Sequence, residues 1–420
     1  MKIRLYFMFR MIVFLLTALL LYPENGRCQS GDLDYYIKKG ITSSPVIKDL
    51  TNQIQVNKCD SLVARAGYLP QVSFNAMLMY APVVNGWGYS EVITNGQQLL
   101  GTMNVNQQFL NKKTREANLR KFGIQGMNLD NTRHISINEL KSAITAQYLA
   151  AFSAFSQKNY HIQILQSLKE EEEIMGHFVE AGTYRQTDLL TLKVEIMNME
   201  RSIKDLDIQY RKEFSNLRII CGITDTTRYP LSLPSISEIP SISGEKSPLL
   251  RKFYYDSLRI QNEREMVDSR YKPTVNWFSD GGIVNNLPSD IYKNFGISFG
   301  LTMGLPIYDG NQRKQLYAKI KTEEDSRKNY RDYSRFVYES QLKQMAGELN
   351  QVRASAAETQ KQVETIEELI RQDKVLLNVG SLGINDYILA LKSMIEARHN
   401  SILYQIRAQY LINEINFLKQ

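Results

Sequence analysis

The strongest constraint on the fold is an internal repeat whose spacing is intact. The interval from Asn111 to Gly182 is 71 residues, and the interval from Asp309 to Gly380 is also 71. Inserting one residue into a helix would rotate every later side chain by about 100°. Two long intervals of equal length therefore predict one continuous helix in each half of the chain.

Shorter motifs repeat in the same order around these intervals. Pro70 and Pro273 each lie 25 residues after the proline of a Ser-Pro pair, and Asp188 and Asp386 each lie six residues after the glycine. Only the interval from the proline to the helix differs, 41 residues against 36, which indicates a surface loop there. We therefore expect a first repeat at 29–222, a linker rich in proline and serine at 223–246, and a second repeat at 247–420.

The two long segments have the length of bundle helices. Residues 112–176 and 311–378 contain no proline. At about 1.5 Å per residue, 71 residues rise roughly 100 Å, so such a helix needs equally long neighbours. Shorter helices are expected at about 32–67 and 247–270.

The second helix of each repeat carries apolar residues at alternating spacings of three and four. This spacing is typical of a coiled-coil seam, although an ordinary amphipathic helix in a globular core is the alternative. The seam of the first repeat is Leu189, Leu192, Ile196, Met199, Ile203, Leu206 and Tyr210, and that of the second is Tyr387, Ala390, Met394, Ala397, Ser401, Tyr404 and Ala408.

Each repeat also contains two candidate strands, at 71–80 and 102–109 and at 274–284 and 295–305. The last strand alternates large apolar residues with glycine, serine and threonine, which is typical of a membrane β-strand with lipid on one side and water on the other. The strand at 274–284 has the weakest pattern, because Phe278 breaks the alternation. The expected lipid-facing residues are Phe295, Ile297, Phe299, Leu301 and Met303.

Four strands cannot close a barrel, and backbone groups left unpaired in lipid cost several kcal/mol each. Closure therefore requires several copies of the chain. Three copies, giving twelve strands, are the smallest arrangement with an open lumen. The strands themselves predict an oligomeric barrel, but they do not specify that the number of chains is three.

The N-terminus has the features of a secretory signal peptide at 1–28. A basic segment precedes the apolar run 11–22, which is too short to span a bilayer as a helix. Cleavage before Gln29 fits best, while a lipid anchor on Cys28 is a minority alternative because Arg27 occupies a position that favours a small residue. Removing this segment lowers the net charge from +7 to +4, because it holds four basic residues and one acid.

The remaining composition argues against several other functions. The charges are interspersed, so we expect no nucleic-acid binding. The four histidines lack metal-ligand spacing, and no nucleophile or phosphate-binding motif is present, so we expect no enzyme activity, cofactor or metal. The acidic run 170–173 is interpreted as a solvated helical face. Cys59 and Cys221 are interpreted as small packed residues rather than a disulfide.

Taken in order, these motifs resemble the TolC-type outer-membrane efflux proteins over nearly the whole mature chain. The resemblance rests on Leu69-Pro70-Gln71 opening a strand, Leu305-Pro306-Ile307-Tyr308-Asp309 closing one, and the turns Ala181-Gly182-Thr183 and Val379-Gly380-Ser381. The segment 410–416 is also similar to the last helix of that family.

The resemblance implies a mainly α fold with long antiparallel coiled-coil helices. Three chains would form a twelve-stranded barrel in the outer membrane of a Gram-negative bacterium and an α-barrel in the periplasm. It also implies a periplasmic adaptor, which links the channel to an inner-membrane pump of the RND or ABC type. The turns that would face the adaptor contain Gly182, Thr183, Gly380 and Ser381.

The resemblance further implies that Asp386, with Asp188 as its repeat equivalent, lines the periplasmic aperture. A ring of such carboxylates would favour cations. The alternative is that both cap the following helix. The family's second ring aspartate and its latch arginine are replaced here by Leu389 and Leu382, so the aperture must be held shut differently, and a contact of Arg185 with Asp188 is one hypothesis.

The leading functional interpretation is a passive channel of a tripartite efflux or type I secretion system. The alternative is a periplasmic coiled-coil scaffold without channel activity. The scaffold explains the heptads and the export signal but leaves the strand at 295–305 without a role. The transported substrate and the class of pump are not specified by the sequence.

Overall fold

The computed structural model describes residues 32–90, 92, 96–240, 247–286 and 292–420 of the 420-residue chain. The expected signal peptide at 1–28, including Cys28, lies outside the described residues.

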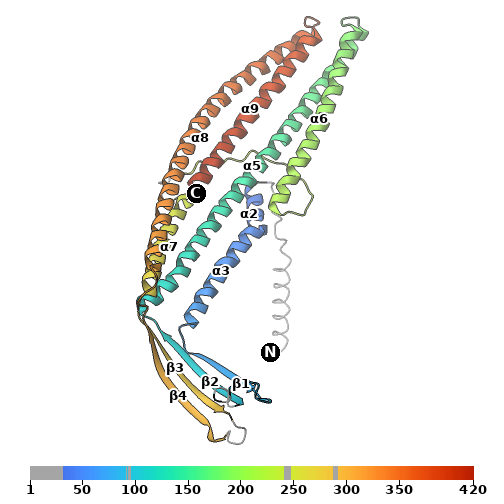
Figure 1. Cartoon of the computed structure of the whole chain (residues 1–420). Helices are drawn as coiled ribbons and strands as arrows, with labels where there is room; N and C mark the ends of the chain where they lie inside the picture. The colour runs from blue at the N-terminus through green and yellow to red at the C-terminus, as the bar shows by residue number, and fades with distance from the viewer. Residues whose placement is uncertain (1–31, 91, 93–95, 241–246, 287–291) are drawn as a thin grey trace, which may run out of the picture. The chain divides into compact units, whose positions relative to one another are not determined.

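The described part of the chain is mainly helical and contains a four-stranded antiparallel sheet (Figure 1). The order of two strands, a long helix and a second helix occurs twice, preceded by α2 and α3 in the first half and by α7 in the second, as the predicted internal duplication requires. The elements are α2 (Leu33–Ser43), α3 (Pro45–Ala66), β1 (Gln71–Tyr80), β2 (Gln97–Phe109), α5 (Lys112–Glu180), α6 (Gln186–Cys221), α7 (Pro248–Arg270), β3 (Thr274–Asn285), β4 (Phe295–Gly304), α8 (Gln312–Asn378) and α9 (Ile384–Lys419).

The expected single helix at 32–67 is wrong in one respect, because it is divided into α2 and α3. The break lies at Ser44, whose backbone is extended with φ −56° and ψ 120°. A residue before proline is disfavoured in the helical region, because the proline ring clashes with its backbone. Pro45 therefore ends α2 and begins α3.

The repeated Asn111 and Asp309 both stabilise the start of a long helix. The Asn111 Oδ1 accepts a hydrogen bond from the N–H of Lys113 at 3.0 Å, and the Asp309 Oδ2 accepts one from the N–H of Arg313 at 2.7 Å. The first N–H groups of a helix lack partners within it, which is why a short polar side chain is favoured at this position. The matching motifs thus both lie at a helix start, although Asn111 directly precedes α5 and Asp309 lies three residues before the first residue of α8.

The described residues form two compact units. The first contains 32–45, 137–240 and 340–420, and the second contains 46–136, 247–286 and 292–339. The helices α5 and α8 each contribute to both.

The first unit is held together by coiled-coil packing. Both predicted seams are largely buried, with Leu192 fully inaccessible in α6 and Tyr387 1% exposed in α9. A further cluster joins α2 to α5 and α6; it is formed by Leu33, Tyr36, Ile144, Tyr148, Ala151, Ala154, Tyr210, Phe214, Leu217, Cys221 and Leu231.

The segment between the repeats is fixed to the end of α9 by side-chain amides. The N–H of Ile236 donates to Gln409 Oε1 and the N–H of Ile239 donates to Asn416 Oδ1, both at 2.8 Å. The Nζ of Lys419 lies 3.1 Å from Glu238 Oε1. The described part of the predicted linker, 223–240, is therefore held against α9, which accepts hydrogen bonds from the backbone N–H groups of Ile236 and Ile239.

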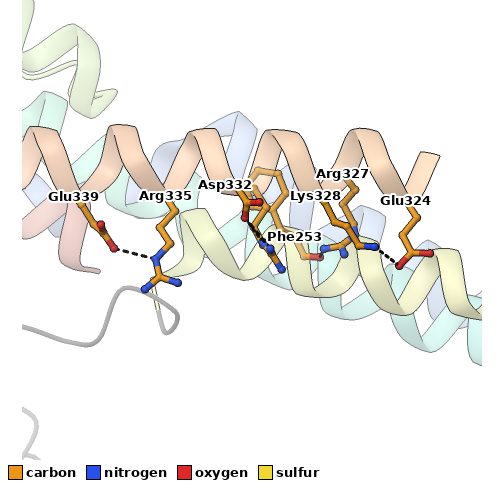
Figure 2. Close-up of polar contacts among 8 residues, drawn as sticks. Phe253, Glu324, Arg327, Lys328, Asp332, Arg335 and Glu339 are labelled. Atoms are coloured by element: carbon orange, nitrogen blue, oxygen red, sulfur yellow. Dashed lines mark hydrogen bonds and ion pairs between the residues drawn. The ribbon is translucent and has the colours of Figure 1, made fainter. Parts of the chain in front are cut away.

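In the second unit, α7 packs against the first part of α8. Ile260 and Val267 of α7 meet Ile320 of α8 in a small apolar cluster. Figure 2 shows Arg327 of α8 donating to the carbonyl oxygen of Phe253 in α7 at 3.3 Å, beside ion pairs that run along the surface of α8.

The sheet has the order β1-β2-β3-β4, so β1 and β4 are its edges. The observed β2 begins at Gln97, earlier than the predicted residue 102, and the other three strands match the predicted ranges within one residue. The register places Trp277 opposite both Gln107 and Leu301. Because directly opposed residues point to the same face, the alternating patterns of all four strands combine into one sheet.

One face of the sheet is largely apolar. Its members, read from the register, include Val72, Phe74, Leu78, Tyr80, Leu99, Met103, Val105, Phe109, Val275, Trp277, Ile283, Phe295, Ile297, Phe299, Leu301 and Met303. Phe278, which breaks the pattern, lies on the other face opposite Gly300. A Cβ on Gly300 would lie 2.6 Å from the Phe278 ring, so the ring occupies the space that a side chain would fill.

Candidate functional site: the two helix turns and the sheet

The turns α5–α6 and α8–α9 have the same backbone structure. Gly182 and Gly380 both have φ +76°, in the left-handed region where L side chains are strained. In the first turn, Gly182 N–H donates to the carbonyl oxygen of Val179 and Thr183 N–H to that of Phe178. In the second, Gly380 N–H donates to Leu377 and Ser381 N–H to Leu376. Each is a Schellman motif, which satisfies the last carbonyl groups of the helix.

The two aspartates lie three residues after the helix caps. The N-terminal caps of α6 and α9 are Arg185 and Gly383, so the expectation that Asp188 and Asp386 are themselves N-caps is wrong by one turn. Asp188 Oδ2 accepts a hydrogen bond from the backbone N–H of Arg185 at 3.1 Å. It thus supplies the carboxylate half of a capping box, and it contacts the backbone of Arg185 rather than its guanidinium.

Tyr184 connects the two turns. Its hydroxyl lies 2.7 Å from the carbonyl oxygen of Leu377 and 2.8 Å from that of Leu382, and it can donate to one at a time. Thr183 is close as well, because a Cβ on Gly380 would lie 3.0 Å from its Cγ2. Burial, and secondarily the charge of Asp188, raises the pKa of Tyr184, so the hydroxyl stays protonated and able to donate.

Beneath the turns, apolar side chains from four helices form one cluster. Its buried members are Ile164, Leu168, Met175, Leu192, Ile196, Met199, Leu377, Ile384, Tyr387, Ile388 and Leu391. Leu382 packs against this cluster, whereas Leu389 is 65% exposed. The turns are therefore supported by a shared apolar core as well as by the Tyr184 hydroxyl.

Solved structures with this arrangement include outer-membrane channels. One is CusC, whose structures are described in terms of folding and transmembrane channel formation. It superposes on this chain with a TM-score of 0.77 at 10% sequence identity, and the aligned region covers 95% of each chain. The outer-membrane protein VceC from Vibrio cholerae superposes with a TM-score of 0.74 at 12% sequence identity. The aligned region covers 92% of this chain and 96% of VceC. The MtrE outer-membrane channel of Neisseria gonorrhoeae, in its open state, superposes with a TM-score of 0.76 at 12% sequence identity. The aligned region covers 92% of this chain and 88% of MtrE.

The chain has the fold of the TolC-type outer-membrane channels. The predicted fold class is thereby confirmed. No protein-family model and no curated protein matches the sequence. The likeness is therefore one of structure, at sequence identities of 10–13%.

Within this TolC-type fold, the acidic run on α5 contains a residue that sequence reasoning misplaced. Glu171 is 1% exposed, which corrects its interpretation as part of a solvated face. Lys374 Nζ of α8 lies 2.7 Å from its Oε1. Glu171 continues the apolar series Ile164, Leu168 and Met175 at spacings of four, three and four residues, and this position in the seam is the signal that indicates burial.

The carboxylate of Glu171 also affects Tyr387 of α9, which is 1% exposed. Burial raises the pKa of the Tyr387 hydroxyl, and the negative charges of Glu171 and Asp373 raise it further. An ion pair between the two repeats, with its carboxylate buried and its lysine partly exposed, thus lies next to the apolar core that supports the turns.

Further ion pairs join the helices at heptad spacing. Lys193, Glu200 and Asp207 of α6 are seven residues apart, and each pairs with α5. Their partners are Glu172 at 3.8 Å, Lys169 at 2.8 Å and Lys158 at 2.6 Å. Charged pairs beside the seam are typical of coiled coils and set the pairing of helices.

The cysteine prediction is half correct. Cys221 is buried, and burial raises its pKa to about 12. Cys59 is exposed, so its interpretation as a packed residue is wrong. Both thiols are free in the structure.

In the sheet, the five expected lipid-facing residues of β4 are 65–80% exposed and share one face. Among the described residues, no group of three or more histidine, cysteine, aspartate or glutamate side chains could hold a metal. None of the described helices is both long enough and apolar enough to cross a membrane.

Proposed function

We propose that this chain is one subunit of a homotrimeric outer-membrane channel that passively exports substrates. In this proposal three four-stranded sheets form one barrel in the outer membrane, and the long helices form a periplasmic α-barrel. Substrates are delivered by an inner-membrane pump of the RND or ABC type through a periplasmic adaptor.

The sheet carries this proposal. Eleven of the sixteen large side chains on the apolar face are exposed and the other five are half-buried, which is far more apolar surface than a monomer in water leaves exposed; lipid is the environment that would cover it. Both edges, β1 and β4, have unpaired backbone groups. Those groups need partners in lipid.

The strand directions fit closure by identical copies. An even number of antiparallel strands leaves β1 and β4 running in opposite directions. The β4 strand of one copy can therefore pair antiparallel with β1 of the next, and the pattern continues until the barrel closes. The aromatic residues Tyr330, Tyr333 and Phe336, each 66–68% exposed on α8, offer further surface for contact between copies.

The turns support docking of the adaptor. Gly182, Thr183, Gly380 and Ser381 are all exposed, and the adjacent Val379 is 67% exposed. The rigid Schellman geometry presents small side chains that a partner helix can approach closely. Asp386 is exposed at the start of α9, where it would line the aperture of the assembled channel together with Asp188.

The test is to purify the full-length protein from the outer-membrane fraction in detergent, cross-link it, and reconstitute it in planar bilayers. We expect a cross-linked trimer and discrete conductance steps. A strict monomer, or a protein recovered only in the soluble periplasmic fraction, would overturn the proposal and favour a scaffold.

Adaptor docking has its own test. A photo-cross-linking residue at Thr183 or Ser381 should capture the adaptor in intact cells, whereas one at Lys204, in the middle of α6, should not. Equal capture at all three positions would contradict docking at the turns.

A further inference from the structure

The four strands contain a single charged side chain, that of Asp280 in β3. The other 44 residues of β1, β2, β3 and β4 are apolar or uncharged polar. A lone carboxylate in a sheet that is otherwise free of charge needs a specific environment, because an ionised group is costly to place in an apolar medium.

The register places Asp280 on the polar face of the sheet. It lies opposite Asn104 in β2 and opposite Ser298 in β4, and Asn276 lies four residues away on the same face. The Ser298 hydroxyl donates to Asp280 Oδ2 at 2.5 Å. The carboxylate is thus on the side opposite to Phe299 and Ile297, which belong to the apolar face.

The side chains around Asp280 are short. On the same face of β4, residues 296, 298, 300 and 302 are glycine, serine, glycine and threonine, and a Cβ on Gly296 would meet nothing within 4 Å. A shallow hollow of about 190 Å³ lies here, lined in part by Thr102, Asp280, Gly282 and Ser298. No basic side chain is present in the strands to neutralise the carboxylate, so its field extends into the space above this face.

We propose that Asp280 is a charge-selectivity determinant in the lumen of the assembled barrel. The inference rests on the proposed function, because it takes the polar face as the inner one. Three copies then place three carboxylates at one level around the channel axis. A ring of like negative charges lowers the energy of cations at that level and raises that of anions, as in other channels with carboxylate rings.

The Asp280 ring is separate from Asp386 and Asp188, which lie on helices. The Asp280 ring would act independently of those residues, so that anionic solutes meet a barrier in the barrel even when the periplasmic aperture is open. The preferred cargo is therefore cationic or neutral.

The experiment compares wild-type protein with Asp280→Asn and Asp280→Lys in planar bilayers under a KCl gradient. Asp280→Asn keeps the size and hydrogen-bonding capacity of the side chain and removes its charge. We expect it to lower the K⁺/Cl⁻ permeability ratio by about two- to threefold, and Asp280→Lys to lower it further. The matched control is Ser73→Ala, on the polar face of β1, which removes a hydroxyl that does not contact Asp280 and should leave the ratio unchanged.

A second measurement covers the case in which the Asp280 variants fail to assemble. In protein that retains Asp280, Asn104→Cys places a thiol beside the carboxylate, and a cationic thiosulfonate reagent should modify it faster than an anionic one of similar size. Asn106→Cys, at an exposed position on the same face, should show a similar preference, whereas Val105→Cys, on the apolar face, should react with neither.

The outcomes separate the two proposals. Channels whose selectivity is unchanged in Asp280→Asn, or equal reaction rates for both reagents at Asn104→Cys, would overturn the role of Asp280 and leave the channel intact. Absence of any conductance by the wild-type protein would instead overturn the proposed function.

Discussion

The Tyr184 hydroxyl, at the turn that follows α5, lies 2.7 Å from the carbonyl oxygen of Leu377 at the end of α8. These residues are 193 positions apart and belong to different repeats. One side chain therefore joins the two turns, in a protein whose Leu382 replaces the arginine that the family resemblance leads one to expect as a latch.

Replacing Tyr184 with phenylalanine should loosen the turns. The variant keeps the ring, which packs against Phe178 at 5.9 Å between centroids, and loses only the hydroxyl. Loss of one such hydrogen bond costs about 1 kcal/mol, so amide hydrogen exchange in both turns should accelerate about fivefold. Tyr404→Phe is the control, since its hydroxyl has no hydrogen-bond partner among the described residues. Unchanged exchange at residues 379–383 would show that Tyr184 does not hold the second turn.

The two turn glycines should differ in their tolerance of alanine. Both have φ +76°, so either substitution costs about 1 kcal/mol of backbone strain. A Cβ at position 182 meets nothing within 4 Å, whereas one at position 380 meets Thr183 Cγ2 at 3.0 Å. Gly380→Ala should therefore lower the thermal unfolding midpoint more than Gly182→Ala. The double substitution Gly380→Ala with Thr183→Ser removes the contacted methyl group and should recover the difference.

The sequence predicted the elements of this fold better than the contacts between them. Equal intervals located the long helices, and alternation located the strands, because both signals are local and periodic. The partners of Tyr184 could not be predicted, since they are backbone carbonyls that carry no sequence signal. The burial of Glu171 could have been predicted, because it occupies a seam position of α5. The helix break at Ser44 could also have been predicted from the sequence, because a proline follows this residue.

Removing only Lys374 from its ion pair with Glu171 should lower the stability of the protein more than removing both charges. Lys374→Met leaves a carboxylate that is 1% exposed without its cation, while the lysine itself is 41% exposed, which reduces the effect. We expect a loss of about 2 kcal/mol, and recovery of most of it in Glu171→Met with Lys374→Met. Lys193→Met is the matched control, because its pair with Glu172 is longer and more exposed, at 3.8 Å. A double variant less stable than Lys374→Met, in thermal unfolding, would contradict this account.

Acidification should destabilise the helical unit through His161. This residue of α5 has its pKa lowered by burial and by the nearby His399 of α9, and its Nδ1 lies 3.0 Å from the Ser202 hydroxyl. The unfolded chain, with a histidine pKa of about 6.5, binds the proton more readily than the folded one. The stability that depends on neutral His161 is thus present above pH of about 6.5 and is lost as the pH falls through the folded pKa.

The measurement is the thermal unfolding midpoint between neutral and mildly acidic pH. His161→Gln should flatten this profile, because glutamine does not titrate. His177→Gln is the control, since that side chain is 78% exposed and should leave the profile unchanged. A wild-type profile that is already flat would show that His161 does not contribute.

The apolar face of the sheet can be tested with the two tryptophans of the chain, Trp87 and Trp277. Trp277 lies on the apolar face opposite Leu301, whereas Trp87 lies in the connection between β1 and β2. In vesicles that contain lipids brominated on their acyl chains, Trp87→Phe leaves Trp277 as the only fluorophore, and we expect strong quenching. The reciprocal variant Trp277→Phe reports on Trp87 and should be quenched less by the same lipids. Weak quenching of Trp277 would place the apolar face away from the acyl chains, and the lipid-facing assignment of Phe299 and Leu301 would then be wrong.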